Sequence, residues 1–322
     1  PLPARYGNRL ASIVDLDSTS VDASAPRSVS LSNFNAGLRW GQTNSASAFG
    51  EQLFAARIGT LGAWIEDYSP DVGRPQYGDV FLKLRRSYSN DSELLLAALG
   101  ARSKLSYFDP DTTERAQLAS RTTYAWLRAR TVLSENTRIE AMLGFSAIDS
   151  EREGSLAGGL APIGELTDRR RSRFVDGNLR LLQSLPQHSI DAGLAFAIGR
   201  GRYGYESTVE YDPTATTLFA VTPQRSRRAL FELRRWTAAA HLADRWEVAP
   251  RWYLESGLRA DVHGGAGRDG AQLNPHLALR WDAAPSVTLR GSWGRASQAP
   301  EAHELRVEDG ERQFGNAQRV QQ

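Results

Sequence analysis

The chain has 322 residues, with 39 Lys and Arg against 37 Asp and Glu. This near balance argues against a nucleic-acid-binding protein, which would need a one-sided basic surface. The absence of cysteine excludes disulfides, cysteine-ligated metal centres and thiol catalysis. Charged residues make up 24% of the chain and interrupt every apolar run before the roughly 18 residues that a membrane-spanning helix needs. Strands can still cross a membrane, because only every second residue of a strand faces lipid.

Hydrophobic alternation with a period of two residues recurs along nearly the whole chain and predicts an all-β, antiparallel fold. Strands are expected near 27–32, 35–42, 47–58, 76–88, 93–107, 117–133, 137–149, 168–185, 188–203, 228–248, 251–263, 272–282 and 286–295. Some exceed the ~9–11 residues that cross a bilayer, and these would project beyond its outer surface. Short helical turns are expected at 61–67 and 300–305.

The predicted connections alternate between short and long. Turns near 89–92, 134–136, 185–187, 249–251 and 282–285 are short and rich in turn-forming residues. Polar segments near 107–117, 149–167, 204–227, 264–270 and 295–315 are long. A soluble sandwich would mix both lengths at both ends, whereas an outer-membrane barrel places short turns on the periplasmic side and long loops outside. The alternation therefore favours a transmembrane β-barrel.

Aromatic and charged residues bear on the same choice. Trp246, Trp252 and Trp281 lie close to short turns and share the parity of the apolar face, which predicts a lipid-facing girdle. The alternative is that these residues close the bottom of a soluble sandwich. The opposite face carries many charges, which a dry core could not accommodate but a wide lumen could. The arginines of this face include Arg128, Arg130, Arg259, Arg280 and Arg290.

Three stretches resemble the TonB-dependent outer-membrane receptor family. They are ARYGNRLASIVDLD at 4–17, RPQYGDVFLKL at 74–84 and SWGRASQAPEAHEL at 292–305, similar to the last plug strand, an early barrel hairpin and a mid-barrel strand with a small helix. The resemblance implies a barrel of roughly 22 strands that encloses a plug. We expect 1–26 to be the end of the plug with its linker and 27–322 to be a partial barrel. The coupling box and most of the plug would lie outside this sequence.

By the same resemblance, the parent protein would be located in the outer membrane and import a scarce nutrient. The nutrient would be a ferric siderophore, a vitamin or an oligosaccharide, bound without a chemical step or a cofactor. Implied partners are the inner-membrane TonB complex, outer-membrane lipid and lipopolysaccharide. The alternatives are a passive porin, which would lack a plug, and a barrel hydrolase. Against the hydrolase, no Gly-x-Ser-x-Gly elbow is present.

Candidate ligand residues lie on the inward face and at the predicted outer rim. The inward arginines would attract an anionic ligand, since guanidinium groups match carboxylates well. They would otherwise pair with acids of the lumen or plug. Tyr203 and Tyr205 would stack on sugars or catechols, or belong to an outer aromatic girdle. The basic cluster at 168–173 would hold lipopolysaccharide phosphates or be a solvated loop base. His241, His263 and His276 lack metal-ligand spacing.

Overall fold

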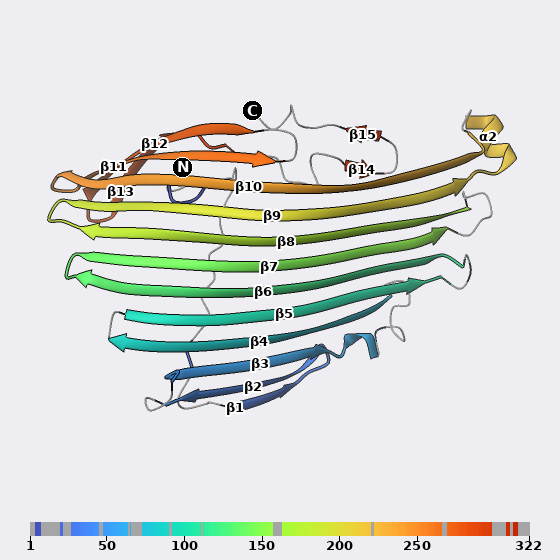
Figure 1. Ribbon diagram of the computed structural model, residues 1–322, viewed down its shortest axis with the longest axis horizontal. Coiled ribbons are helices and arrows are strands. Elements are labelled where there is room, and N and C mark those ends of the chain that lie inside the picture. Colours follow the sequence, from blue (N-terminus) through green and yellow to red (C-terminus); the bar gives the residue numbers. More distant parts are fainter. Residues whose placement is uncertain are drawn as a thin grey trace.

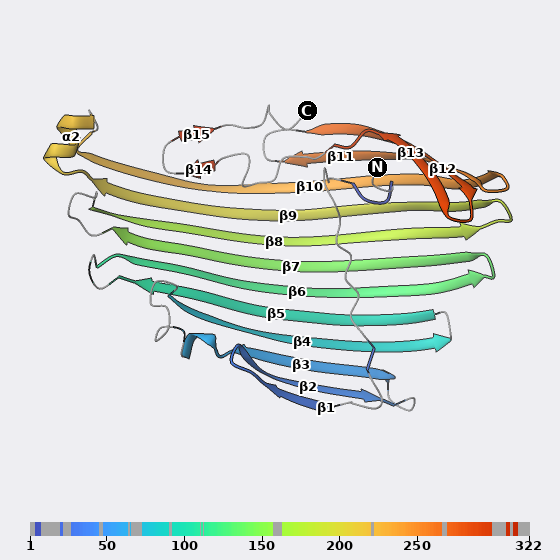
Figure 2. The same cartoon turned by 180° about the vertical axis from the view of Figure 1, so that it is seen from behind.

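The computed structural model describes residues 4–7, 20–21, 27–44, 48–63, 65, 73–89, 92–109, 111, 113–156, 163–219, 222–265, 269–297, 307–309 and 312–314. Within these ranges, one antiparallel sheet contains thirteen strands in chain order, and each strand pairs with the next (Figures 1 and 2). A two-stranded sheet, β14–β15, follows. The predicted all-β fold and the number of strands in the main sheet are confirmed.

The strands are longest in the middle of the main sheet. Their bounds are β1 Arg27–Leu31, β2 Asn35–Thr43, β3 Glu51–Gly59, β4 Arg74–Ser89, β5 Ser92–Phe108, β6 Arg115–Ser134, β7 Thr137–Leu156, β8 Ile163–Ser184, β9 His188–Glu210, β10 Gln224–Ala249, β11 Trp252–Gly265, β12 Gly270–Ala284, β13 Val287–Gly294, β14 Val307–Asp309 and β15 Arg312–Phe314. Figure 1 shows the sheet curving at one edge, where β11 to β13 turn over β10.

Period-2 alternation gives the sheet two chemically different faces. Leu194 lies between Leu179 and Ala240 in the register of β8, β9 and β10, and its side chain is 59% exposed. We call this apolar side the outer face. The opposite, inner face carries Arg259, which is only 7% exposed and contacts the N-terminal residues. The predicted parity is confirmed along the apolar stretch of the strands, where large apolar side chains such as Leu194 and Leu258 lie on the outer face and charged side chains such as Arg259 lie on the inner face.

The two ends of the sheet also differ. Short turns join β4 to β5, β6 to β7, β8 to β9, β10 to β11 and β12 to β13 at one end, the short-turn end. The connection between β2 and β3 also lies at this end, because Glu51 at the start of β3 pairs with Arg85 near the end of β4. The remaining connections of the main sheet, including those after β5, β7, β9 and β11, lie at the opposite end, the loop end (Figure 2). Several short turns are preceded by a register shift, such as that between Ser87 and Ser89. Such irregularities increase local twist and help end the pairing where the chain reverses.

The structure corrects the predicted loops at 149–167 and 204–227. Strand β7 continues to Leu156 and β8 begins at Ile163, while β9 continues to Glu210 and β10 begins at Gln224. The outward residues of these strands are apolar over the part nearer the short-turn end, which we call the apolar belt. Between the belt and the loop end, both faces of the strands carry polar residues, so the hydrophobic alternation is lost. The ladder of backbone hydrogen bonds continues there, because pairing does not require an apolar side chain.

The remaining connections contain short elements. The predicted helical turn at 61–67 is a 3-10 turn over Leu61–Ala63, and 300–305 lies outside the described residues. The segment between β9 and β10 contains a short helix, α2 (Pro213–Phe219), which the sequence analysis missed. Its signal was Asp212 before Pro213: Asp212 accepts a hydrogen bond from the Thr214 amide at 2.7 Å, as an N-cap residue does. Among the described residues, no helix is long and apolar enough to cross a bilayer.

Candidate functional site on the inner wall

A continuous chain of ion pairs crosses the inner face from β3 to β10. Its contacts include Lys83–Glu51 at 3.0 Å, Arg85–Glu51 at 2.5 Å, Arg128–Glu93 at 3.1 Å, Arg130–Glu140 at 3.0 Å, Arg180–Asp191 at 2.7 Å and His241–Asp191 at 3.2 Å. Arg85 links Glu51 to Glu93, and Arg180 links Glu140 to Asp191. We call this set the ion-pair chain. Its members lie toward the short-turn end of their strands.

Strand register explains why these residues meet. Glu93 lies directly opposite Arg130, Arg130 opposite Glu140, and Glu140 opposite Arg180 on successive strands. Opposite charges at directly facing positions attract across the ladder. The predicted ligand residues Arg128 and Arg130 are therefore already engaged with acids of the wall. An anionic ligand would have to compete with these carboxylates to reach them. In this structure, Arg128 and Arg130 therefore follow the alternative interpretation, in which inward arginines pair with acids of the lumen.

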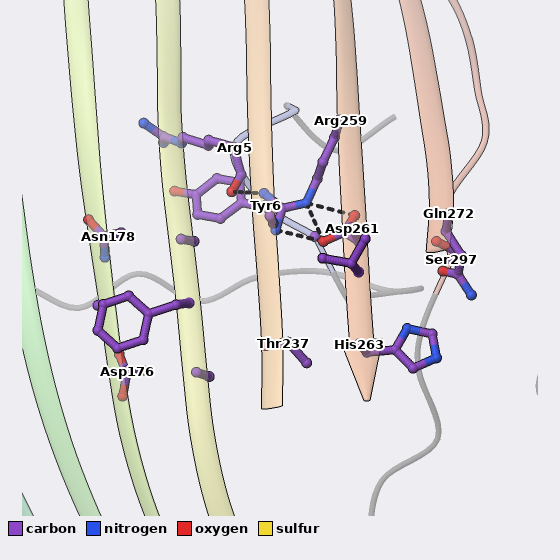
Figure 3. A pocket seen from close by; sticks show the side chains of 17 residues that line it. Arg5, Tyr6, Asp176, Asn178, Thr237, Arg259, Asp261, His263, Gln272 and Ser297 are labelled. Carbon is purple, nitrogen blue, oxygen red and sulfur yellow. Dashed lines mark hydrogen bonds and ion pairs between the residues drawn. The ribbon is translucent and has the colours of Figure 1, made fainter. Parts of the chain in front are cut away.

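Arg259 lies on a different part of the inner face, on β11, and holds the N-terminal segment (Figure 3). Its guanidinium donates to Asp261 at 2.9 Å and to the backbone carbonyls of Arg5 and Ala4 at 3.1 and 3.4 Å. Gly7 allows this close approach, because a Cβ there would lie 1.9 Å from Nε of Arg259. Arg259 thus ties the segment at 4–7 to the wall of the sheet.

A polar cavity of about 390 Å³ lies beside this contact. Figure 3 shows Tyr6 on one side and Asp176, Asn178 and His263 around it. Asn274, near the cavity, donates hydrogen bonds to Asp261 at 3.2 Å and to Ser297 at 2.7 Å, which orders this rim. The volume is within the range of small-molecule sites, although the lining is more polar than usual.

The other predicted arginines lie toward the short-turn end. Arg280 donates two hydrogen bonds to Asp282, at 2.9 and 2.8 Å, and its guanidinium lies 5.4 Å from the ring centroid of Tyr253. Arg290 lies directly opposite Arg280 on β13. The five predicted arginines therefore share one face but do not converge on a single site.

Tyr203 and Tyr205 lie on the inner face of β9, toward the loop end. Tyr203 faces Phe231 on β10, and their rings stack with centroids 4.9 Å apart. Tyr205 is 9% exposed and lies opposite Asp168 on β8. Their alternation with outward Arg202 shows that they do not belong to an outward-facing girdle. Sequence analysis did not place Phe231 or Asp168 beside these tyrosines, because their proximity depends on strand register.

The three predicted girdle tryptophans lie on the outer face near the short turns. Trp252 stacks on Trp281 across β11 and β12, with centroids 4.9 Å apart, and Trp246 stacks on His188. Trp246 and Trp281 are 40% and 36% exposed. Amphipathic rings at this position suit a membrane interface. Contact with lipid stays a prediction.

Two of the three inward histidines singled out in the sequence, His241 and His276, lie beside acids. His241 lies 3.2 Å from Asp191, and His276 lies 3.5 Å from Glu255. His263 lines the polar cavity. In the described part of the chain, no group of three or more His, Cys, Asp or Glu is arranged to hold a metal ion.

Sequence comparison places this sheet in a family. The family model described as TonB dependent receptor-like, beta-barrel matches residues 16–320. The chain belongs to the TonB-dependent receptor family. Members of this family are outer-membrane proteins, so the sheet is part of the wall of an outer-membrane barrel. A search of curated protein sequences finds no match.

Solved structures show the same fold. The ferric-catecholate import receptor Fiu of Escherichia coli K12, in its closed form, has a TM-score of 0.61 at 11% identity over 88% of this chain and 51% of that receptor. The ferripyoverdine receptor of Pseudomonas aeruginosa has a TM-score of 0.60 at 11% identity, over 83% and 41%. BauA of Acinetobacter baumannii, a ferric preacinetobactin receptor, has a TM-score of 0.55 at 12% identity, over 80% and 44%. The chain thus spans about half or less of these receptors.

Membrane topology gives a first testable prediction. In outer-membrane barrels, short turns are periplasmic, so the β9–β10 connection should be outside the cell. A protease site inserted before α2 should be cut when protease is added to intact cells, whereas the same site inserted in the β8–β9 turn should be cut only after the outer membrane is opened. Immunoblotting of the fragments provides the measurement. Cleavage of the short-turn variant in intact cells would invert the topology.

Proposed function

We propose that the chain forms part of a receptor that binds a ferric siderophore outside the cell and imports it by a TonB-dependent mechanism. Family membership supports transport, and the receptors named above are described as receptors or importers of ferric siderophores. Import of this kind is non-covalent and needs no catalytic residue. The plug assignment of residues 1–26 belongs to the same proposal, and the grip of Arg259 on the carbonyls of Ala4 and Arg5 supports it.

The observation that carries the ligand proposal is an aromatic and cationic patch on the inner face near the loop end. We call Tyr203, Tyr205 and Phe231, with Arg152 and Arg170, the aromatic patch. Register places Tyr203 between Arg170 and Phe231, and Tyr205 opposite Asp168. The loop end faces the exterior, so a ligand entering from outside would meet this part of the wall early.

The chemistry of the patch suits a ferric chelate. Asp168 is 8% exposed and accepts hydrogen bonds from Arg152 at 3.1 Å and Arg170 at 2.8 Å. Both arginines remain 45% exposed, so this acid holds them while much of each side chain faces open space. Aromatic rings stack on the planar rings of catechols, and guanidinium groups attract anionic chelates.

Removing Tyr203 should weaken ferric chelate binding. A stacked aromatic contact contributes about 0.5–1.5 kcal/mol, so Tyr203→Ala in the full receptor should raise Kd about 2- to 10-fold. Tyr205 is only 9% exposed, so Tyr205→Ala should change binding less. The measurement is binding of a radioiron-loaded tricatecholate siderophore and of a trihydroxamate siderophore to isolated outer membranes. Tyr88→Ala is the control, because Tyr88 is 64% exposed at the short-turn end.

Two results would count against the proposal. If the Tyr203→Ala variant binds the chelate as tightly as the wild-type receptor does, the aromatic patch is not part of the ligand-binding site. Uptake that persists at the full rate in cells without TonB would favour the passive porin. The first outcome concerns these residues alone, while the second concerns the mechanism of transport.

A further inference from the structure

The outer face of β5 to β10 changes from apolar to strongly basic at one level. On β9, outward Ile198 is followed two residues later by Arg200 and then Arg202, and Ile198 lies between Val175 and Trp236 in the register. The six residues that face one another just above this apolar belt form a straight row across six strands. The row is Arg102, Arg121, Asp149, Arg171, Arg202 and Glu232, and we call it the arginine row.

Like charges lie directly opposite each other within this row. Arg102 faces Arg121, and Arg171 faces Arg202. One step closer to the apolar belt, Arg200 lies between Arg173 and Arg234. Like-charged residues at directly facing positions destabilise strand pairing. A bound anion would turn this repulsion into attraction, so the pattern itself indicates a missing negative partner.

Acids on the same wall relieve only part of the repulsion. Arg173 donates to both carboxylate oxygens of Asp149 at 3.0 Å. Arg202 donates to Glu232 at 2.8 Å, and Arg169 is paired with Glu151 and Glu153. Arg171 lies 4.0 Å from Asp149, which also faces Arg121 in the register. Across the described ranges, no ion pair within 4.0 Å joins Arg102 or Arg121 to an acid, and the row itself holds four arginines against two acids. The row therefore retains uncompensated positive charge.

Two hollows lie along this part of the wall. One of about 280 Å³ is lined by Arg102, Arg121, Arg169 and Arg171, together with Asp149 and Glu151. The other, of about 330 Å³, is lined by Arg169, Arg171, Arg202 and Arg228, together with Glu206. They share Arg169 and Arg171, whose side chains are 59% and 68% exposed. Each hollow can hold a group of phosphate size within reach of several guanidinium groups.

We propose that the arginine row binds the phosphate groups of lipopolysaccharide in the outer leaflet. Guanidinium groups match phosphate oxygens with paired hydrogen bonds. Free phosphate shares this chemistry, but the position favours the lipid. The row lies on the outward face immediately above the apolar belt, where the headgroups of surrounding glycolipids carry their phosphates. Strands β5 to β10 extend beyond the belt, so this wall is continuous with the lipid-facing surface.

The test uses the receptor purified in detergent and native mass spectrometry with lipid A that carries two phosphates. R102Q/R121Q and R171Q/R202Q each remove one like-charged pair. Either variant should bind lipid A about tenfold or more weakly than wild type, because several charge-assisted hydrogen bonds are lost. The matched control is R138Q/R245Q, which removes the same charge from inward positions on β7 and β10 and should leave binding unchanged. A heat-dependent shift in gel mobility confirms that each variant is folded.

The outcomes separate the possible ligands. Dephosphorylated lipid A should bind as weakly to wild type as phosphorylated lipid A binds to the row variants. Equal binding of phosphorylated and dephosphorylated lipid A, or wild-type affinity in both row variants, would overturn the proposal. Binding of inorganic phosphate with the affinity of lipid A would assign the row to free phosphate and overturn the lipid assignment. None of these results depends on the siderophore proposal.

Discussion

Replacing Leu194 with arginine is expected to destabilise the folded barrel strongly. Leu194 lies midway along the apolar stretch of β9, on the outer face, and is 59% exposed to the surroundings. An arginine at the bilayer midplane on the lipid face of a barrel costs roughly 2–4 kcal/mol, which is a large part of the net stability of a folded protein. Urea titration of the receptor folded into lipid vesicles measures the loss directly.

The matched control is Ala195→Arg, one residue further along the same strand. Ala195 is on the inner face and lines the polar cavity of about 390 Å³, where a guanidinium group can remain hydrated and lies near Asn178 on β8. This variant should lose far less stability than Leu194→Arg. If both substitutions cost the same, the assignment of the outer face to lipid would be wrong. Leu258→Arg on β11 provides a second test, since Leu258 is also outward and 45% exposed.

Alternation made the strands and their faces predictable from the sequence, because lipid demands apolar side chains at every second position. Trp252, Leu254 and Leu258 keep that rhythm along β11, and the structure places them on one face. The same reasoning failed beyond the membrane. At the end of β7 and the start of β8, outward positions such as Asp149 and Arg169 are as polar as the inward ones, so no alternation remained to indicate a strand.

The basic cluster at 168–173 shows this failure in detail. As a continuous run of charged residues, the cluster resembles the solvent-exposed base of a loop. In the structure it lies within β8. Strand alternation therefore divides it between the two faces. Arg170 lies on the inner face with Asp168, and Arg169 and Arg171 lie on the outer face, where they line the basic hollows. One sequence motif thus contributes to two different sites.

The ion-pair partners of the inward charges could not be predicted from the sequence, because they depend on the strand register between residues that are far apart in the chain. Arg128 and Glu93 are 35 positions apart, and Arg259 and Ala4 are 255 positions apart. The turn lengths and the register shifts before the turns decide which carboxylate faces which guanidinium. Parity could place all these arginines on one wall, but it could not show that Arg128 and Arg130 were already paired.

The second large effect is expected at the start of the ion-pair chain, where Glu51 meets Lys83. Their side chains are only 6% and 2% exposed and lie 3.0 Å apart. Lys83 faces Leu53 on one side and Ala97 on the other, both buried. Without Glu51, the ammonium group would lose its 3.0 Å ion pair at a position with little access to water. Removing one partner of a buried pair typically costs about 3–5 kcal/mol.

A double-mutant cycle separates the pair from its surroundings. Glu51→Leu alone should lose about 3–5 kcal/mol in urea titration, whereas E51L/K83M should recover much of that loss, because the buried ammonium group is removed together with its partner. Arg85, which also pairs with Glu51, is 31% exposed and keeps Glu93 at 3.8 Å in both variants. The control is Arg57→Met, which breaks the pair of Arg57 with Asp79 on the same two strands. The charged atoms of Arg57 and Asp79 lie 2.8 Å apart, but their side chains are 53% and 25% exposed. This ion pair should therefore contribute at most about 1 kcal/mol to the free energy of unfolding. Equal losses for Glu51→Leu and Arg57→Met would show that water reaches Lys83 and that the inner wall is hydrated at this level.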